Sequence, residues 1–444
     1  MGVGLAMVMI VGAIVGTQVY VQKQIDRRTE IGRQDEAFLK LMGQLANLPE
    51  TAVKERQTIY LALGRLQDDR ASTFLVDALA QENKEQVIQA LVQAIVNDGL
   101  DILPEIKALN FQLRQQLQSI GGNNIQEIKS LKLRLNGTKQ AIVQILQLHH
   151  QQIDTPLSLD KIDLNGDETG QDNYAPNLNQ LDLASVSLKG TLISQGNFQQ
   201  SVFFRQHNNE IQTTDLSGAD LKDGDFTEAN LTQVNLSLTN LMRTQFYQAS
   251  LKGANLEKAN LSGAKLVMAQ LQNTNFQGAK LTGAMVNQAD FTDADLGQAS
   301  LEQVTAIATN FTQANLTQVN SRNSDFNQAN FSKANLQGSN FTNSNFSFAN
   351  LSKTNLKDAD LSNVDLSKAD LTGANLDGTD FRNVMFAKSR TDQSSDPASS
   401  FVVYPLSEDQ AQIKGVNFNK VLNLDTRQLQ FICAQGGIHS QCQD

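Results

Sequence analysis

Residue types that carry catalysis are scarce in this chain of 444 residues. It has four His, and its two Cys, Cys433 and Cys442, both lie within the last dozen residues. The sequence contains no GxSxG nucleophile motif, no HExxH metal motif and no phosphate-binding loop ending in GKS or GKT. Close carboxylates such as Asp358 and Asp360 belong to a repeat that places Asp there for structural reasons. We therefore predict a protein that is not an enzyme and that uses no cofactor.

One stretch has oxygen ligands at a spacing that calcium loops use. In DLNGDETGQDN, Asp163, Asn165 and Asp167 stand at alternate positions. An EF-hand also needs Gly at position six and Glu at position twelve of the loop, where this chain has Glu168 and Tyr174. We predict an acidic turn in a linker here and no metal site, with calcium binding as the alternative.

The N-terminal segment gives the clearest indication of localisation. Residues 1–22, MGVGLAMVMIVGAIVGTQVYVQ, contain no charged side chain, and as a helix they would span ~32 Å, enough for the bilayer core. A cleaved signal peptide would need a basic start and a small-residue cleavage site, which this segment lacks. We predict an uncleaved, single-pass membrane anchor. Gly12 and Gly16 form a GxxxG motif that could pack two anchors together, which would give a homodimer.

The charges that follow the anchor bear on its orientation. Lys23, Arg27 and Arg28 come after the apolar segment, and no basic residue precedes it. By the positive-inside rule we expect the body of the protein in the cytoplasm, with the periplasm and the thylakoid lumen as alternatives. A disulfide between Cys433 and Cys442 would require the body to lie outside the cytoplasm.

Residues 30–150 have the apolar spacing of helices, at i, i+3 and i+4. The piece LALGRLQDDRASTFLVDALAQ resembles HEAT-like repeats, and it recurs loosely in QALVQAIVNDGLDILPEIKAL. Such helical pairs stack and present a surface to partners. The alternative is a small helical bundle that joins the anchor to the body. We expect residues 151–177 to be a linker.

The second half of the chain has a period of five. From Leu216 to Phe386 there are 35 pentapeptides in one register, and 32 of them have Leu or Phe at the centre. The residue two before the centre is always small or β-branched, and the residue one before it is Asn or Asp in 26 of 35. Six earlier centres, from Leu178 to Phe203, keep the spacing in another phase, and an insert at 204–212 absorbs the shift.

A period of five fits neither a helix nor an ordinary strand. One large and one small inward residue in every five require the chain to turn a corner every five residues. Four such sides close a square coil of 20 residues, and successive coils pair their backbones at ~4.8 Å. Asn and Asp beside the centre suit the corners, because they bond neighbouring backbone and tolerate turn conformations.

The pattern resembles the pentapeptide-repeat family, A(D/N)LXX, whose members form a right-handed quadrilateral β-helix. The resemblance covers about half the chain and implies a mainly β fold, preceded by an all-α region and one transmembrane helix. We expect this β-helix over residues 178–388, with about ten coils and a length of roughly 50 Å.

Three centres depart from the pattern. Ala306 and Ser321 replace large residues, and Val286 is a milder case. We expect the core to be thinner near these coils, through a bulge or a small cavity, with Ile307 turned inward to fill the gap.

The C-terminal end is expected to close the stack. A loop rich in Ser, Asp and Pro should extend over 389–414, followed by a cap over 415–444 with a short helix. Asp425 or Thr426 can cap this helix and Gly436 can end it. We interpret Cys433 as a buried residue of this cap.

These features favour a membrane-anchored scaffold or protein-interaction rod. An envelope or thylakoid assembly factor is the alternative, on family resemblance alone. Some family members mimic DNA and bind gyrase, but residues 216–386 carry 16 acidic and 12 basic residues, a net charge of only −4. B-DNA of ~40 Å length would carry about 24 charges, so this function and nucleic-acid binding are disfavoured.

A candidate binding surface follows from the 20-residue coil. Tyr247, Val267 and Ile307 fall in one outward column, and Met268 lies beside Val267. Exposed apolar stripes of this kind often mark partner sites. These four residues are therefore a candidate interaction stripe for an unidentified protein partner, while scattered surface apolar residues are the favoured interpretation.

Overall fold

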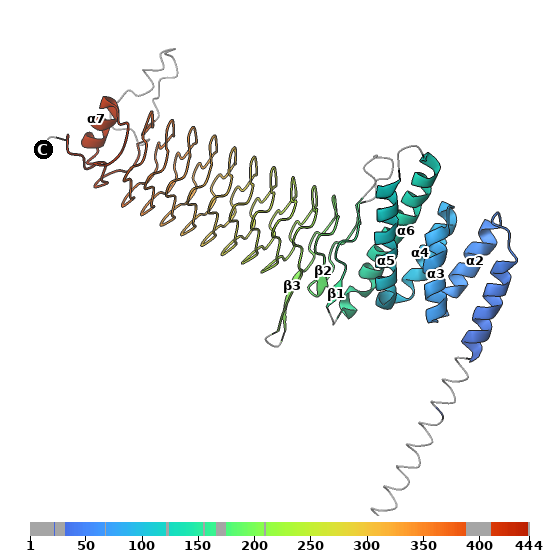
Figure 1. Ribbon diagram of the computed structural model, residues 1–444. Helices are drawn as coiled ribbons and strands as arrows, with labels where there is room; N and C mark the ends of the chain where they lie inside the picture. The colour runs from blue at the N-terminus through green and yellow to red at the C-terminus, as the bar shows by residue number, and fades with distance from the viewer. Residues whose placement is uncertain are drawn as a thin grey trace, which may run out of the picture. The chain divides into compact units, whose positions relative to one another are not determined.

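The structure is a computed structural model. By its internal contacts the chain divides into two compact units, Met1–His149 and His150–Asp444. In their described parts, the first unit is helical and the second is a stack of short coils (Figure 1). The structure describes residues 22, 32–66, 68–120, 124–153, 156–165, 175–207, 210–387 and 410–442.

The helical unit includes a helix over residues 32–46 and a series of shorter helices after it. Asp68 caps the second helix of this series, because its side chain accepts the backbone N–H of Arg70 at 2.9 Å. The series consists of α2 (Val53–Leu63), α3 (Asp69–Gln81), α4 (Glu85–Val96), the 3-10 helix η1 (Gly99–Ile102), α5 (Leu103–Ser119) and α6 (Ile125–His149).

Alternate helices of this unit pack on one another. α4 lies against both α2 and α6, and α3 lies against α5, as in a layered helical repeat. Leu91 and Ile95 of α4 are fully buried. Gly64 at the end of α2 is so close to α4 that a Cβ there would clash with the backbone of Ala94. The helical prediction for residues 30–150 is confirmed in the described part, while membership of the HEAT family stays a prediction.

In the second unit, which opens with the 3-10 helix η2 (His150–Gln152), the coil begins earlier than the sequence indicated. β1 (Leu157–Ser158) pairs in parallel with β2 (Val186–Ser187). Leu159 and Leu164 are fully buried, like the central residues of the later repeats. The linker predicted over residues 151–177 therefore contains part of the first coil. Two centres five residues apart are too short a run to be recognised.

Parallel backbone pairing then links residues 20 apart, for example Asn235 with Asn255. One coil is interrupted by a hairpin, in which β3 (Phe204–His207) pairs antiparallel with β4 (Glu210–Thr213). The hairpin projects from the side of the stack (Figure 1). It accounts for the insert predicted at 204–212 and for the change of phase.

Each repeat turns its corner on the two residues after the central Leu or Phe. The second of these has a positive φ, as in Asn273 (58°), and the next N–H closes the turn, as Thr274 donates to Leu271 O at 3.3 Å. The Asn or Asp before the centre lies outside the turn. Its side-chain oxygen accepts the N–H two residues on, as Asn275 does from Gln277 at 2.9 Å. The prediction that Asn and Asp adopt the corner conformation is therefore wrong, although they do bond neighbouring backbone.

The corners give the coil four faces, each a column of repeats 20 residues apart. On every face three residues point outward: the bridge position before the centre, and the first and second turn positions after it. We name the faces by their central columns: face A from Leu216 to Leu376, face B from Leu221 to Phe381, face C from Phe226 to Phe386, and face D from Leu231 to Leu371.

The coil continues without interruption where the large centres are missing. Parallel pairing is unbroken past Ala306 and Ser321 within the described coils, and both residues are buried. Ile307 keeps 36% of its surface exposed. The predicted bulge and the inward rotation of Ile307 are therefore wrong, while the small cavity stays a prediction.

The C-terminal segment rejoins the coil before it forms a helix. Gln412 pairs with Asp370, so the end of the loop predicted over 389–414 belongs to the coil. The predicted short helix is α7 (Thr426–Ala434). Asp425 is its N-cap and accepts a backbone N–H of the first turn at 2.8 Å, as the sequence indicated.

The predicted anchor, residues 1–22, lies outside the described residues except for its last position, and so do Gly12 and Gly16. Every helix within the described ranges is too short or too polar to span a bilayer. The anchor and its GxxxG motif therefore stay predictions.

Candidate interaction surface

The four residues of the predicted stripe lie on one face of the coil. Tyr247, Val267 and Ile307 occupy the first turn position of face C, and Met268 follows Val267 at the second turn position. Tyr247 and Met268 are 42% and 40% exposed, and Val267 is half-buried. Parallel pairing of Gln245 with Lys265 stacks these coils in register. The structure thus brings the predicted residues together in one outward apolar column.

Two residues that the sequence analysis missed extend this column. Met285, at a bridge position of face C, is 40% exposed, and Phe348, at a second turn position, is 50% exposed. The amino group of Lys368 lies 4.8 Å from the centre of the Phe348 ring. What we call the face C stripe therefore spans six coils, five of which carry its residues, and is about 24 Å long at the usual strand spacing. It consists of Tyr247, Val267, Met268, Met285, Ile307 and Phe348.

The bridge positions of face C also differ from those of the other faces. Elsewhere the bridge residue is mostly Asn or Asp and caps the N–H two residues on, as Asn255 does for Glu257 at 3.1 Å. In the described coils, the N–H groups of Tyr247 and Val267 have no such cap. Backbone donors therefore lie at the surface among apolar side chains. Four consecutive bridge residues of face C are neither Asn nor Asp: Gln245, Lys265, Met285 and Thr305.

The second turn position is unfavourable for apolar residues. Its left-handed conformation costs an ordinary L-residue about 1–2 kcal/mol, and most repeats place Gly, Asn, Gln, Lys or Asp there. On face C, Met268, Ala308 and Phe348 hold this conformation, with φ of 59°, 54° and 62°, and their side chains are exposed. Leu238 on face A does the same. Strain that supports no buried contact indicates a role outside folding.

Charge is sparse along the middle of the stripe. Among the outward positions of face C between residues 245 and 308, all of them described, Lys265 is the one charged residue. Charges return toward the ends, with Glu228 before the stripe, Asp325 in its second half and Lys368 after it. The surface is therefore apolar in its middle and charged at its edges.

The sequence held a signal for the two missed residues. A search of one column at the first turn position finds Tyr247, Val267 and Ile307 but cannot find Met285 or Phe348. These two residues instead break the rules of the bridge and second turn positions. Aligning all outward positions at a period of 20 and marking each exception would have identified both.

The candidate ligand residues do not assemble into a site in the described part of the chain. Asp358 and Asp360 lie on faces A and B, respectively. Asp163 accepts the N–H of Asn165 at 3.0 Å, and most of the calcium-like stretch, 166–174, lies outside the described residues. Among the described residues, no cluster of His, Cys, Asp and Glu could hold a metal ion.

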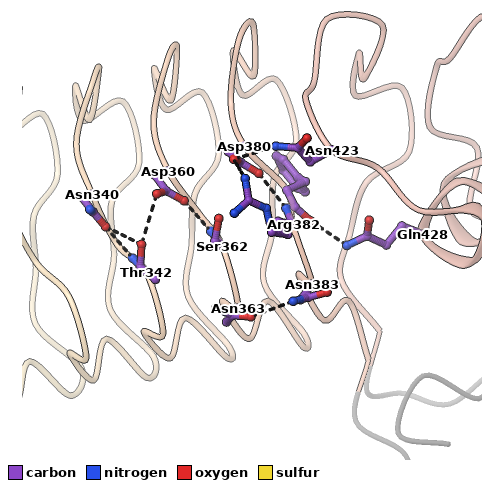
Figure 2. A network of polar contacts seen from close by, with 11 residues as sticks. Asn340, Thr342, Asp360, Ser362, Asn363, Asp380, Arg382, Asn383, Asn423 and Gln428 are labelled. Atoms are coloured by element: carbon purple, nitrogen blue, oxygen red, sulfur yellow. Dashed lines mark hydrogen bonds and ion pairs between the residues drawn. The ribbon is translucent and has the colours of Figure 1, made fainter. Parts of the chain in front are cut away.

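The C-terminal end of the stack is closed by a polar network. Figure 2 shows Asp380 accepting a hydrogen bond from Asn423 at 2.8 Å. The buried amide of Gln428 on α7 donates to the carbonyls of Phe381 and Val384 at 2.8 and 3.0 Å. Unpaired backbone at the end of a β-stack is a template for aggregation. The network therefore ends the stack and prevents further coils from adding to it.

A disulfide fastens this cap. Cys433, on α7, is bonded to Cys442, with their Cα atoms 5.3 Å apart. Cys433 belongs to the cap as expected, but it is half-buried where the sequence analysis expected a buried residue. The bond ties the helix to the turn that follows it.

The family comparison agrees with this architecture. A model of the family described as pentapeptide repeats matches the chain in eight copies, at residues 214–245, 239–278, 269–305, 307–343 and 344–383. Residues 214–383 are pentapeptide repeats. The resemblance drawn from the period of five is thereby confirmed, and the face C stripe lies within this pentapeptide-repeat domain.

Several solved structures are similar to the chain. HetL, a pentapeptide repeat protein involved in heterocyst differentiation regulation in the cyanobacterium Nostoc sp. strain PCC 7120, is 25% identical, with a TM-score of 0.42 over 53% of this chain and 95% of HetL. A pentapeptide repeat protein of the Arabidopsis thaliana thylakoid lumen is 25% identical, with a TM-score of 0.23 over 30% of this chain and 79% of that one.

A trypsin-treated variant of QnrB1, a plasmid-mediated fluoroquinolone resistance protein, is 22% identical, with a TM-score of 0.26 over 45% of this chain and 89% of its own. None of the curated proteins matches the chain. Since all three TM-scores are low, we draw no function from these likenesses.

Proposed function

We propose that this protein is a non-enzymatic scaffold that binds a protein partner through the face C stripe and that residues 1–22 tether it to a membrane. The observation that carries the proposal is the stripe itself. Exposed apolar side chains such as Met268 and Phe348 belong to residues with a strained backbone conformation. They lie on the face where four consecutive bridge positions have neither Asn nor Asp. The conformation is unfavourable for these residues, and their side chains stay exposed.

The chemistry of the stripe suits a protein surface. Aromatic and Met side chains are enriched at protein interfaces, and Tyr is among the residues that dominate their binding energy. Tyr247 supplies such an anchor, and the uncapped N–H groups of Tyr247 and Val267 can donate to acceptors on a partner. The helical unit would offer a second binding surface.

Tyr247→Ser combined with Val267→Ser tests the proposal. Both side chains point outward, so the free energy of unfolding should change by no more than about 0.5 kcal/mol. Chemical crosslinking in native membranes should recover at least about five-fold less partner, as expected on loss of an interface anchor. Leu238→Ser, which removes an exposed apolar side chain from face A, is the control. Full recovery of crosslinked partners by the double variant would exclude the stripe.

We further propose that the pentapeptide-repeat domain lies in an oxidising compartment, such as the periplasm or the thylakoid lumen. The bond between Cys433 and Cys442 supports this location, because disulfides are rare in the cytoplasm. It argues against the cytoplasmic body expected from the charges after the anchor. Protease digestion of sealed vesicles whose cytoplasmic face points outward tests the location. A cytoplasmic domain would be accessible to the protease, and a periplasmic or lumenal domain would be protected.

The alternative functions have less support. A DNA mimic that binds gyrase needs dense negative charge, whereas residues 216–386 have a net charge of −4 and the middle of face C is nearly uncharged. A role in assembly of an envelope or thylakoid membrane is compatible with a tethered scaffold. It rests on family resemblance alone.

A further inference from the structure

We propose that the occupant of the face C stripe is the same face of a second copy of this chain, laid against it in antiparallel orientation. This rests on the proposed function of the stripe as a protein-binding surface and names the partner. The two-fold axis would lie in the plane between the two faces, perpendicular to the long axes of the stacks, at a height between Asn287 and Ile307. Bridge positions then face bridge positions, and second turn positions face second turn positions. Each coil of one copy then faces a coil of the other at a mirrored height.

The extent of the stripe sets this register. It runs from Tyr247 to Phe348, and its midpoint lies between the coils of Asn287 and Ile307. An antiparallel pair centred there lays the Tyr247 coil of one copy on the Phe348 coil of the other. All the apolar side chains of the stripe are then covered at once. The same register places the side chain of Asn327 opposite Val267. The Asn327 Oδ1 can then accept the uncapped N–H of Val267, while its Nδ2 donates to Ser347 in its own copy.

The charges fit the same register independently. Lys265 and Asp325 both occupy bridge positions, and they lie at equal distances from the axis. Glu228 and Lys368 both occupy second turn positions, again at equal distances. Each copy's Lys265 therefore faces the other's Asp325, and each Glu228 faces the other's Lys368, so every ion pair occurs twice.

One like-charged pair also results. Asp225 comes opposite Asp365, whose side chain is buried and accepts the N–H of Ser367 at 2.9 Å. Asp225 likewise bonds within its own copy, to Thr227 and Gln199. Asp325 is also bonded within its own copy, to the N–H of Asn327 and to Asn345, so burial is what separates the two cases. Asp365 is buried, whereas Lys265 and Glu228 are exposed and Asp325 and Lys368 are half-buried, so the repulsion is weaker than the attraction of the opposite charges.

Other arrangements lose the charge match. A slide of one coil places Lys265 opposite Thr305 or opposite Asn345, and no ion pair forms at the bridge positions. In a parallel arrangement the two-fold axis runs along the stacks, so bridge positions face second turn positions, and Lys265 lies opposite Met268 and Asp325 opposite Gln328. The charges therefore favour the antiparallel orientation, in the same register that the extent of the stripe favours.

The size of the surface predicts a weak dimer. Eight coils from Glu228 to Lys368 span about 34 Å, and three outward residues span about 10 Å. The projected area of ~340 Å² per copy, or ~680 Å² for the pair, lies below the ~1,000 Å² of a stable specific interface, so the dimer is transient. We expect association at micromolar concentration.

Sedimentation of the full-length protein in neutral detergent tests the proposal, from about 1 to about 100 µM. The protein carries Gly12→Ile and Gly16→Ile, so that the predicted anchor does not pair. We expect a dimer that Lys265→Asp or Asp325→Lys each weakens about ten-fold, since two partly exposed ion pairs are reversed in every dimer. An equal mixture of the two variants should restore the dimer, because in the mixed pair the introduced aspartate of one copy faces the introduced lysine of the other.

Lys280→Asp is the matched control, because Lys280 is an exposed bridge residue on face B and should leave the dimer unchanged. A monomer over the whole range, or a dimer that Lys265→Asp does not weaken, would overturn the proposal. Neither result bears on the scaffold function. That function fails only if the variant at Tyr247 and Val267 keeps its crosslinked partners.

Discussion

Faces B and C have the same repeat, the same core and the same backbone path, but their outer surfaces are opposite in character. At the second turn position, face C has Met268, Ala308 and Phe348, which are exposed and apolar. Face B has a ladder of amides there, in which each Nδ2 donates to the Oδ1 one coil earlier at 3.0 or 3.1 Å. The ladder consists of Asn323, Asn343, Asn363 and Asn383.

The difference separates residues that support the fold from residues that do not. Asn tolerates a positive φ, and each rung of the ladder also adds a hydrogen bond, so the outer surface of face B stabilises the stack. The apolar residues of face C have the same conformation without either benefit. Since the backbone is shared, a surface for binding has to be recognised from side chains that depart from what the repeat requires.

Phe326→Ala should have the largest effect, because it acts on the inner side of face C. Phe326 is fully buried, and the centre at Ala306 one coil earlier is already small, so the cavity cannot be refilled. We expect the local free energy of unfolding to fall by about 3–5 kcal/mol, measured by amide hydrogen exchange. Phe348→Ala on the outer side should change it by less than about 0.5 kcal/mol. Equal losses would remove the distinction between the two sides.

An exchange of residues at the second turn position should have an intermediate effect of opposite sign on the two faces. Asn343→Leu on face B should destabilise its coil by about 1–2 kcal/mol, because Leu disfavours a positive φ and two rungs of the ladder are lost. Phe348→Asn on face C should stabilise its coil by about 0.5–1 kcal/mol while weakening the proposed dimer. Hydrogen exchange and sedimentation measure the two effects. A destabilised Phe348→Asn variant would mean that Phe348 supports the fold after all.

Much of the fold could be predicted because the repeat imposes the same demand many times. A run of 35 pentapeptides identified the coil, its 20-residue period and the insert at 204–212. The same redundancy was enough to place Tyr247, Val267 and Ile307 in one column from the sequence alone. Where the repeats are few, as at Leu159 and Leu164, the start of the coil was missed.

What could not be predicted depends on contacts between repeats. Phe326, one coil after Ala306, packs its ring 4.9 Å from that of Phe346, which a pattern read one repeat at a time does not reveal. The sequence could name the bond between Cys433 and Cys442 only as conditional on the compartment, because its geometry depends on how α7 folds back on its following turn. Both features are properties of packing in three dimensions.

The smallest effect is expected from pH, and it distinguishes the Asp290 repeat of face D from the Met285 repeat of face C. Asp290 is a bridge residue of face D, whereas the preceding repeat has Met285, which does not titrate. Burial alone would raise the pKa of Asp290, but hydrogen bonds from Thr292 (2.5 Å), Gln272 (2.6 Å) and Asn310 (3.0 Å) outweigh it and hold the pKa below its ordinary value. The bonds to the carboxylate therefore stabilise the folded coil.

Because the pKa of Asp290 is lower in the folded chain than the value of about 3.9 in an unfolded one, this stabilisation is complete above that value and is lost as the pH falls through the folded pKa. Since the carboxylate is partly exposed, we expect only a few tenths of a kcal/mol. Hydrogen exchange on this coil between about pH 5 and pH 2 should show a slope that Asp290→Asn removes. Thr292→Val should reduce the slope, because it removes one donor and keeps the carboxylate. A slope that persists in Asp290→Asn would assign the acid sensitivity to another carboxylate of the coil, and the proposed contrast between faces C and D would then not rest on Asp290.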